Sequence, residues 1–186
     1  MKSSRWTSAA CMAGGLALTL NLIADPQSPG YVDLGAFSPP ANGRQSVDVH
    51  LKGPLLGMAI RVAETQDPKV AEALRGLESV RVHVEEVSEG NRVELEERIR
   101  TLRVRLTSDG WEPIVNVQQD DQQVGVFLKP SGPETIAGVV VTVLAPKEQA
   151  VFVNVAGELN PEKIARLGQH FGIEPLKKLG QEAAPK

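Results

Sequence analysis

The side chains of this sequence that could do chemistry lie in two short stretches of alternating polar and apolar residues. His50 belongs to SVDVHLK, and His83 belongs to SVRVHVEEV, with Arg81 and Glu85 two positions to either side. Because side chains alternate between the two faces of a strand, Arg81, His83 and Glu85 share one face, and His50 lies on the polar face of its own strand. If a helical crossover makes the two strands neighbours, the imidazoles and the carboxylate could form a surface metal site or an acid–base site.

The alternative is that both histidines are solvated sheet residues beside ordinary charges, because no metal-ligand spacing accompanies them. The sequence has no phosphate-binding loop, dinucleotide fingerprint, zinc-protease motif or serine-nucleophile motif. We therefore predict no catalytic residue, no metal and no cofactor, and we favour a non-enzyme. The face formed by His50, Arg81, His83 and Glu85 remains a speculative polar site.

The single cysteine belongs to a segment that resembles a secretory signal peptide. Lys2 and Arg5 precede a short apolar run that is interrupted by glycines and ends at Ala24. We predict cleavage between Ala24 and Asp25, which gives a periplasmic or secreted protein without a stable membrane span. Cys11 lies ahead of the apolar run, whereas a lipid-attachment cysteine follows it, so we expect no lipid anchor. The mature chain would then contain no cysteine.

Composition excludes several classes of partner. The 186 residues include 20 Lys and Arg against 23 Asp and Glu, a net charge of −3, and only 4% are aromatic. Removal of Lys2 and Arg5 with the leader would make the chain more acidic. An acidic chain without a basic block does not suit nucleic acid or an anionic membrane surface.

Composition and the positions of Pro and Gly divide the chain into four parts. Residues 1–24 are the signal peptide, and 25–46 form a tether rich in Pro and Gly, with an apolar stretch from Tyr31 to Phe37 that could dock on the domain. Residues 47–178 form a single α+β domain, and 179–186 form a disordered tail.

Periodicity predicts the elements of that domain. Leu95, Ile99, Leu102 and Leu106 form one apolar stripe of a helix, whose outer face carries acid-before-base pairs such as Glu96 with Arg100. Asp67 and Pro68 begin a second helical segment after the first strand. Strands are expected near 46–52, 79–87, 112–118, 123–129, 135–144 and 150–156, and a final helix follows Asn160. The order predicts a two-layer α+β sandwich, with a mixed, mostly antiparallel sheet and helices packed on one face.

Three segments taken in order carry a family resemblance. They are GPLLGMAIRVAETQDPKVAEALRGLESVRVHVEEV, GWEPIVNVQQDDQQVGVFLKP and GVVVTVLAPKEQAVFVNVAGELNPEKIARLG. Together they resemble the bacterial domain-of-unknown-function family 4252 (DUF4252) over about residues 47–172. The resemblance implies export to the bacterial envelope, where members are often lipoproteins. It implies no activity and no site residue.

Two functional hypotheses follow. The first is a non-catalytic envelope module that binds a protein partner or a second copy of itself, because we expect one sheet face to lack a cover. The second is a small-ligand- or metal-binding protein, or an enzyme, with a site assembled from scattered polar residues around His50, His83 and Glu85. An accessory role in envelope stress or signalling rests on family analogy alone.

Overall fold

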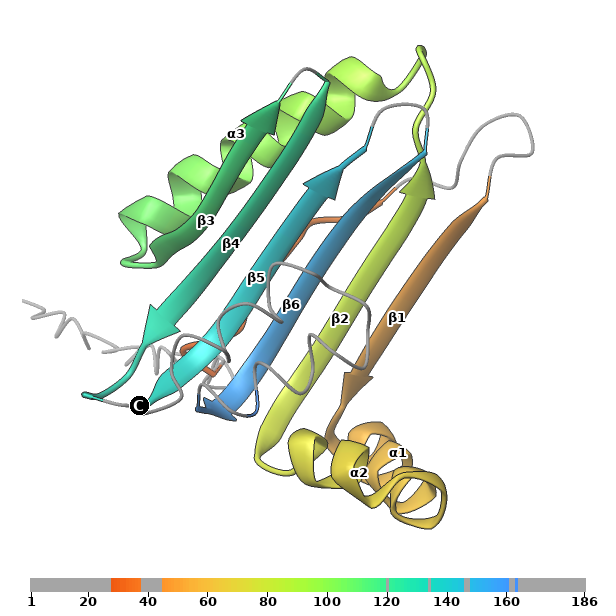
Figure 1. Ribbon diagram of the computed structural model, residues 1–186, viewed down its shortest axis with the longest axis vertical. Coiled ribbons are helices and arrows are strands. Elements are labelled where there is room, and N and C mark those ends of the chain that lie inside the picture. The colour runs from red at the N-terminus through yellow and green to blue at the C-terminus, as the bar shows by residue number, and fades with distance from the viewer. Residues whose placement is uncertain are drawn as a thin grey trace, which may run out of the picture.

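The computed structural model describes residues 28–37, 45–119, 121–133, 135–145, 148–160 and 163. These residues form a six-stranded sheet in the order β1-β2-β6-β5-β4-β3, with every neighbouring pair antiparallel (Figure 1). The strands are β1 (Ser46–Lys52), β2 (Leu77–Glu86), β3 (Glu112–Gln119), β4 (Gln122–Pro130), β5 (Ile136–Leu144) and β6 (Gln149–Leu159). The α+β class and the antiparallel pairing predicted from the sequence are confirmed.

Three helices accompany the sheet, and local signals set their ends. α1 (Gly53–Gln66) and α2 (Pro68–Leu74) meet at Asp67, whose carboxylate accepts the backbone N–H groups of Lys69 and Val70, as an N-cap does. α3 (Arg92–Ser108) buries the predicted stripe Leu95, Ile99, Leu102 and Leu106. It is followed by Gly110, whose φ of 75° suits a residue without a side chain.

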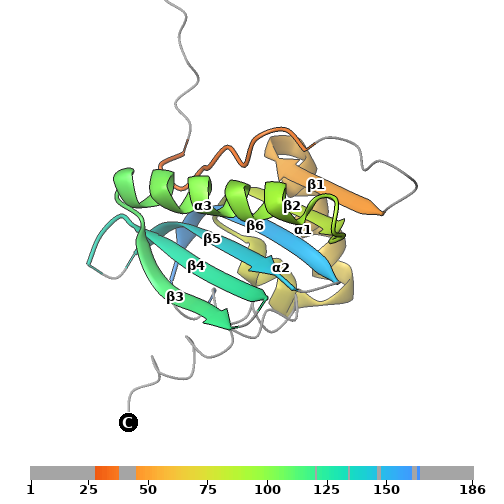
Figure 2. The same cartoon turned by 90° about the horizontal axis from the view of Figure 1, so that it is seen from above.

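The described helices belong to two separate core clusters on opposite faces of the sheet, whereas the sequence predicts helices packed on one face. α3 and the segment 28–37, called the strap below, lie over one face, while α1 and α2 stand at the end of β1 and β2 (Figures 1 and 2). On the strap face, Val140 and Phe152 pack in one cluster with the leucines of α3. On the opposite face, Val139 and Val141 pack in a second cluster with Leu56 of α1 and Leu74 of α2. We call these the strap face and the valine face.

The central position predicted for the strand GVVVTVLA is confirmed, because β5 lies between β6 and β4. Its residues Val139 and Val141 are buried on one face and Val140 and Thr142 on the other. A strand covered on both sides explains why its sequence is apolar without alternation.

The strap is held to the sheet by one asparagine. Asn154 of β6 is 1% exposed, and its amide oxygen accepts the backbone N–H of Val32 at 2.9 Å. Its amide nitrogen donates to the carbonyl oxygens of Gly30, at 3.0 Å, and Val139, at 3.3 Å. The backbone passes so close that a Cβ on Gly30 would lie 1.7 Å from the carbonyl oxygen of Ala137. The apolar stretch that could dock therefore packs on the sheet, with Val32 and Leu34 both buried.

Several predictions concern residues outside the described part of the chain. These are the signal peptide with its cleavage between Ala24 and Asp25, Cys11, the helix after Asn160 apart from Lys163, and the C-terminal tail. Where residues are described, the backbone N–H of Lys163 donates to the side chain of Asn160 at 2.8 Å, as expected of a helix cap. Among the described helices, none has the length and hydropathy that a membrane crossing requires.

Candidate functional site

The residues of the predicted polar face come together on β1 and β2. The two strands pair in register, with His50 opposite Arg81 and Asp48 opposite His83. His50, Arg81, His83 and Glu85 therefore share the strap face. The sequence analysis did not single out Asp48, although its alternation with His50 already placed it on this face.

His83 is buried, which contradicts the solvated reading. It is 2% exposed, and its ring stacks on Phe37 of the strap with centroids 3.4 Å apart and planes 10° from parallel. Its Nδ1 lies 3.4 Å from a carboxylate oxygen of Asp48 and its Nε2 lies 3.7 Å from one of Glu85, and neither nitrogen has a hydrogen-bond partner. The alternation of β2 showed which face His83 takes, but not that the strap covers that face.

The surroundings of His83 favour its neutral form. Burial lowers the pKa of His83 below its ordinary value of 6.5, and the positive charge of Arg98 acts in the same direction. The carboxylates of Glu85 and Asp48 oppose this shift without overcoming it.

Two arginines bind the backbone of the strap where it covers His83. Arg81 of β2 donates to the carbonyl oxygen of Gly35 at 3.0 Å, and its other terminal nitrogen lies 3.5 Å from the carboxylate of Asp33. Arg98 of α3 donates to the carbonyl oxygen of Ala36 at 3.2 Å, and its guanidinium lies 4.5 Å from the centre of the Phe37 ring. The polar residues of this face therefore hold the strap in place.

This arrangement offers little for metal or acid–base chemistry. Among the described residues, no group of three His, Cys, Asp or Glu side chains could hold a metal ion. The ring of His83 is covered by Phe37, and Nε2 of His50 is itself buried and without a hydrogen-bond partner. The four predicted residues share one face, where Arg81 and His83 contact the strap and Glu85 lies near His83.

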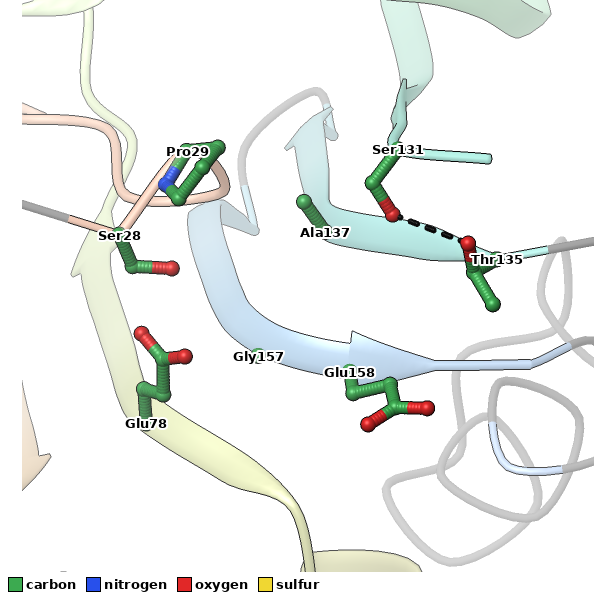
Figure 3. A pocket seen from close by; sticks show the side chains of 8 residues that line it. All are labelled: Ser28, Pro29, Glu78, Ser131, Thr135, Ala137, Gly157 and Glu158. Carbon is green, nitrogen blue, oxygen red and sulfur yellow. Dashed lines mark hydrogen bonds between the residues drawn. The ribbon is translucent and has the colours of Figure 1, made fainter.

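A small hollow lies where the strap begins, near the ends of β5 and β6 (Figure 3). Ser28 and Glu78 face one another across part of it, and Ser131 donates a hydrogen bond to Thr135 at 3.3 Å on another side. Among the described residues, none of these hydroxyls forms a hydrogen bond with a base, so the hollow lacks the pairing that activates a nucleophile.

The outer edge of β1 is a different kind of feature. The backbone N–H of Glu86 in β2 donates to the carbonyl of Gln45, so the backbone groups of Gln45 point toward β2. Backbone groups alternate in direction along an antiparallel strand. The N–H and C=O groups that point away from β2 are therefore those of Ser46, Asp48, His50 and Lys52. Within the described residues no strand pairs with these groups. Beside them Val47 is 55% exposed and Val49 36% exposed. We call this row the open edge.

The neighbouring helix α1 adds apolar surface at the same side of the molecule. Leu55, Met58 and Val62 are each more than half exposed, and their spacing of three and four residues forms a stripe on one side of the helix. Exposed apolar side chains gathered on adjacent elements are typical of a protein-binding surface.

Comparison with known proteins adds one finding. Neither the curated proteins nor the solved structures yield a match to this chain. A family model described as a domain of unknown function, DUF4252, matches residues 42–167, which cover the whole sheet and the three described helices. The chain thus belongs to the DUF4252 family.

Proposed function

We propose that this chain is an exported bacterial envelope protein that acts without catalysis, by binding protein through the open edge of β1, and that its partner is a second copy of the chain. Export is supported by the basic start, the short apolar run and the small residue Ala24. Periplasmic or secreted localisation follows from that leader. A non-catalytic role is supported by the use of the polar face to hold the strap.

The open edge differs from the other edge of the sheet. β3 carries Pro113, and its register with β4 shifts beside that residue, two devices that discourage strand addition. β1 contains no proline, and all seven of its pairs with β2 follow one register. A regular, exposed strand with unpaired backbone groups is the template that an added strand requires.

The sequence of β1 is complementary to itself, and this observation carries the proposal. Antiparallel pairing centred on Val49 sets Asp48 opposite the partner's His50 and Ser46 opposite the partner's Lys52. These are the residues whose backbone groups face outward, so the pairs can exchange hydrogen bonds. This register sets a side chain that can accept a hydrogen bond opposite one that can donate in both pairs, whereas two carboxylates directly across a sheet would destabilise it.

Other registers fit less well. If the centre of the pairing moves from Val49 to Asp48, Asp48 lies opposite the partner's Asp48. If the centre moves to His50, His50 lies opposite the partner's His50 and the paired segment is shorter. Only the register centred on Val49 uses the whole strand from Ser46 to Lys52.

The valine face supports the same pairing. Val49 would meet its own copy at the symmetry axis, and Val47 would meet the partner's Leu51. Because the strands run in opposite directions, the first residues of one β1 lie beside the end at which the partner's α1 begins.

The test is the mass of the chain without its leader, measured by sedimentation velocity over a range of concentrations. We expect a reversible dimer, and we expect Val49→Lys to weaken it on the order of a hundredfold, because two valines lose buried contact and two ammonium groups oppose one another. Val117→Lys, at a valine of the other edge strand that is 43% exposed against 36% for Val49, is the matched control and leaves the dimer intact. A monomer at every concentration, or equal effects of the two substitutions, would overturn the proposal.

A further inference from the structure

Arg103 of α3 is a partly buried cation that has no hydrogen-bond or ion-pair partner among the described residues. Its Nε and one terminal nitrogen, Nη2, are shielded from solvent, and neither has a hydrogen-bond partner. Burial lowers the pKa of its guanidinium. A buried N–H donor left unpaired costs free energy, and a buried charge costs more, so such an arginine is an exception that calls for a physical reason.

The other charged residues near Arg103 are already paired. Arg92 contacts Glu96 at 2.9 Å, and Arg100 contacts Glu97 at 2.6 Å. The expected pairing of Glu96 with Arg100 is therefore wrong, because each residue has a different partner within reach on the helix surface. No carboxylate of the described chain forms an ion pair with Arg103, and its two shielded nitrogens have no other acceptor there.

The strands below α3 leave room for the guanidinium. A Cβ at Gly125 of β4 would lie 2.8 Å from the hydroxyl oxygen of Thr142 and 3.6 Å from Nη2 of Arg103. That hydroxyl is also buried and without a hydrogen-bond partner. Two polar side chains without partners thus lie around one glycine, where any larger residue would fill the space.

A groove of about 540 Å³ adjoins Arg103, between α3 and the strands β3 and β4. Its apolar lining includes Val93, Ile99 and Val104, and Val93 and Val104 are 76% and 68% exposed. The amides of Gln118 and Gln123 line the side formed by the strands. Glu96, Glu97 and Arg100 also line the groove, and each of these two carboxylates already contacts an arginine. An unpaired guanidinium beside an apolar groove suits a ligand with one carboxylate and an apolar body.

We propose that this groove binds a small amphiphilic carboxylic acid, whose carboxylate pairs with Arg103 and whose apolar part lies against Val93, Ile99 and Val104. The guanidinium presents a planar fork of donors, which matches the two oxygens of a carboxylate. Binding would pair the charge that the folded chain leaves unpaired. The site lies on α3, β3 and β4, and it does not depend on the open edge of β1.

The test uses hexanoate as the probe and the chain without its leader as the protein, with the Arg103 Nε–H signal followed by nuclear magnetic resonance. We expect hexanoate to shift that signal saturably, whereas hexanol, which lacks the charge, and inorganic phosphate, which lacks the apolar body, do not. Saturation by hexanol to the same extent would refute the carboxylate contact. Saturation by phosphate at the same concentrations would refute the amphiphilic ligand.

Variants separate the contact from the fold. Arg103→Gln should weaken hexanoate binding about tenfold or more, because a charge-assisted pair is lost, and Arg103→Lys should weaken it less. Arg75→Gln, which removes a guanidinium that lies outside the groove and pairs with Glu64, is the matched control and should bind as the parent does. Binding of these variants is measured by calorimetry, and their melting temperatures establish that they fold. Absence of saturable binding to the parent, or equal binding to Arg103→Gln, would overturn the inference.

Discussion

The ring of Phe37 lies flat on the ring of His83, with the two centroids 3.4 Å apart. This contact joins the strap to β2, and Arg81 and Arg98 reinforce it through the carbonyls of Gly35 and Ala36. The most reactive type of side chain on the predicted polar face is thus held neutral beneath the strap, where it contributes to packing.

Stability should depend on pH through His83. Its pKa in the folded chain is below the ordinary 6.5, so the unfolded chain binds more protons when the pH falls through 6.5. The free energy of unfolding should therefore decrease from about pH 7.5 to about pH 5.5, and this loss stops once the lowered pKa is passed. Urea unfolding over that range measures it. His83→Gln should flatten the slope, and an unchanged slope in that variant would contradict this assignment.

Asn154 should matter far more than its size suggests. Asn154→Ala removes the acceptor of the Val32 N–H and a donor to Gly30, and it leaves buried backbone groups unpaired. We expect a loss of about 2–3 kcal/mol in unfolding free energy, together with faster proteolysis within the strap. Asn116→Ala, on the exposed strand β3, should change stability by less than about 0.5 kcal/mol. Equal effects of the two variants would refute the role of Asn154.

Two glycines should respond to alanine in opposite directions. Gly57 lies within α1, and a Cβ there meets no atom within 4 Å, so Gly57→Ala should stabilise the chain by about 0.5–1 kcal/mol. Gly30→Ala would set a Cβ 1.7 Å from the carbonyl oxygen of Ala137, so the strap must move and the chain should lose about 2 kcal/mol or more. Urea unfolding of both variants decides; a neutral Gly30→Ala would show that the strap does not need this close approach.

The predicted signal peptide implies a specific N-terminal residue for the mature chain. Chain recovered from the envelope fraction should begin at Asp25, as read by N-terminal sequencing, and Cys11→Ala should not change its location. A mature chain that begins at Cys11 and carries a lipid would overturn the prediction of an unanchored protein.

Features that depend on neighbouring residues could be predicted from the sequence, and contacts between distant residues could not. The stripe of α3, the cap at Asp67 and the central place of β5 each depend on residues near one another in the chain, so periodicity and capping rules revealed them. The position of the strap depends on Val32 meeting Asn154, 122 residues away, and no local pattern encodes that contact.

The same limit applies to the functional surfaces. Alternation along β2 grouped Arg81, His83 and Glu85 correctly, but it could not show that Phe37 covers His83. Arg103 has no partner within the described chain because the nearby carboxylates, Glu96 and Glu97, pair with Arg92 and Arg100. The sequence could not show this, because several acid–base pairings on one helix face have equivalent spacings. The open edge became recognisable only when the strand order set β1 at the border of the sheet.

The most direct measurement of the proposed pairing mixes two variants, Val49→Lys and Val49→Glu. Residue 49 meets its own copy in the proposed register, so each variant alone should be a monomer, because like charges oppose one another at the axis. An equimolar mixture should form a dimer that contains one copy of each, detected by sedimentation and native mass spectrometry. A mixture that stays monomeric, or single variants that remain dimers, would contradict pairing through β1.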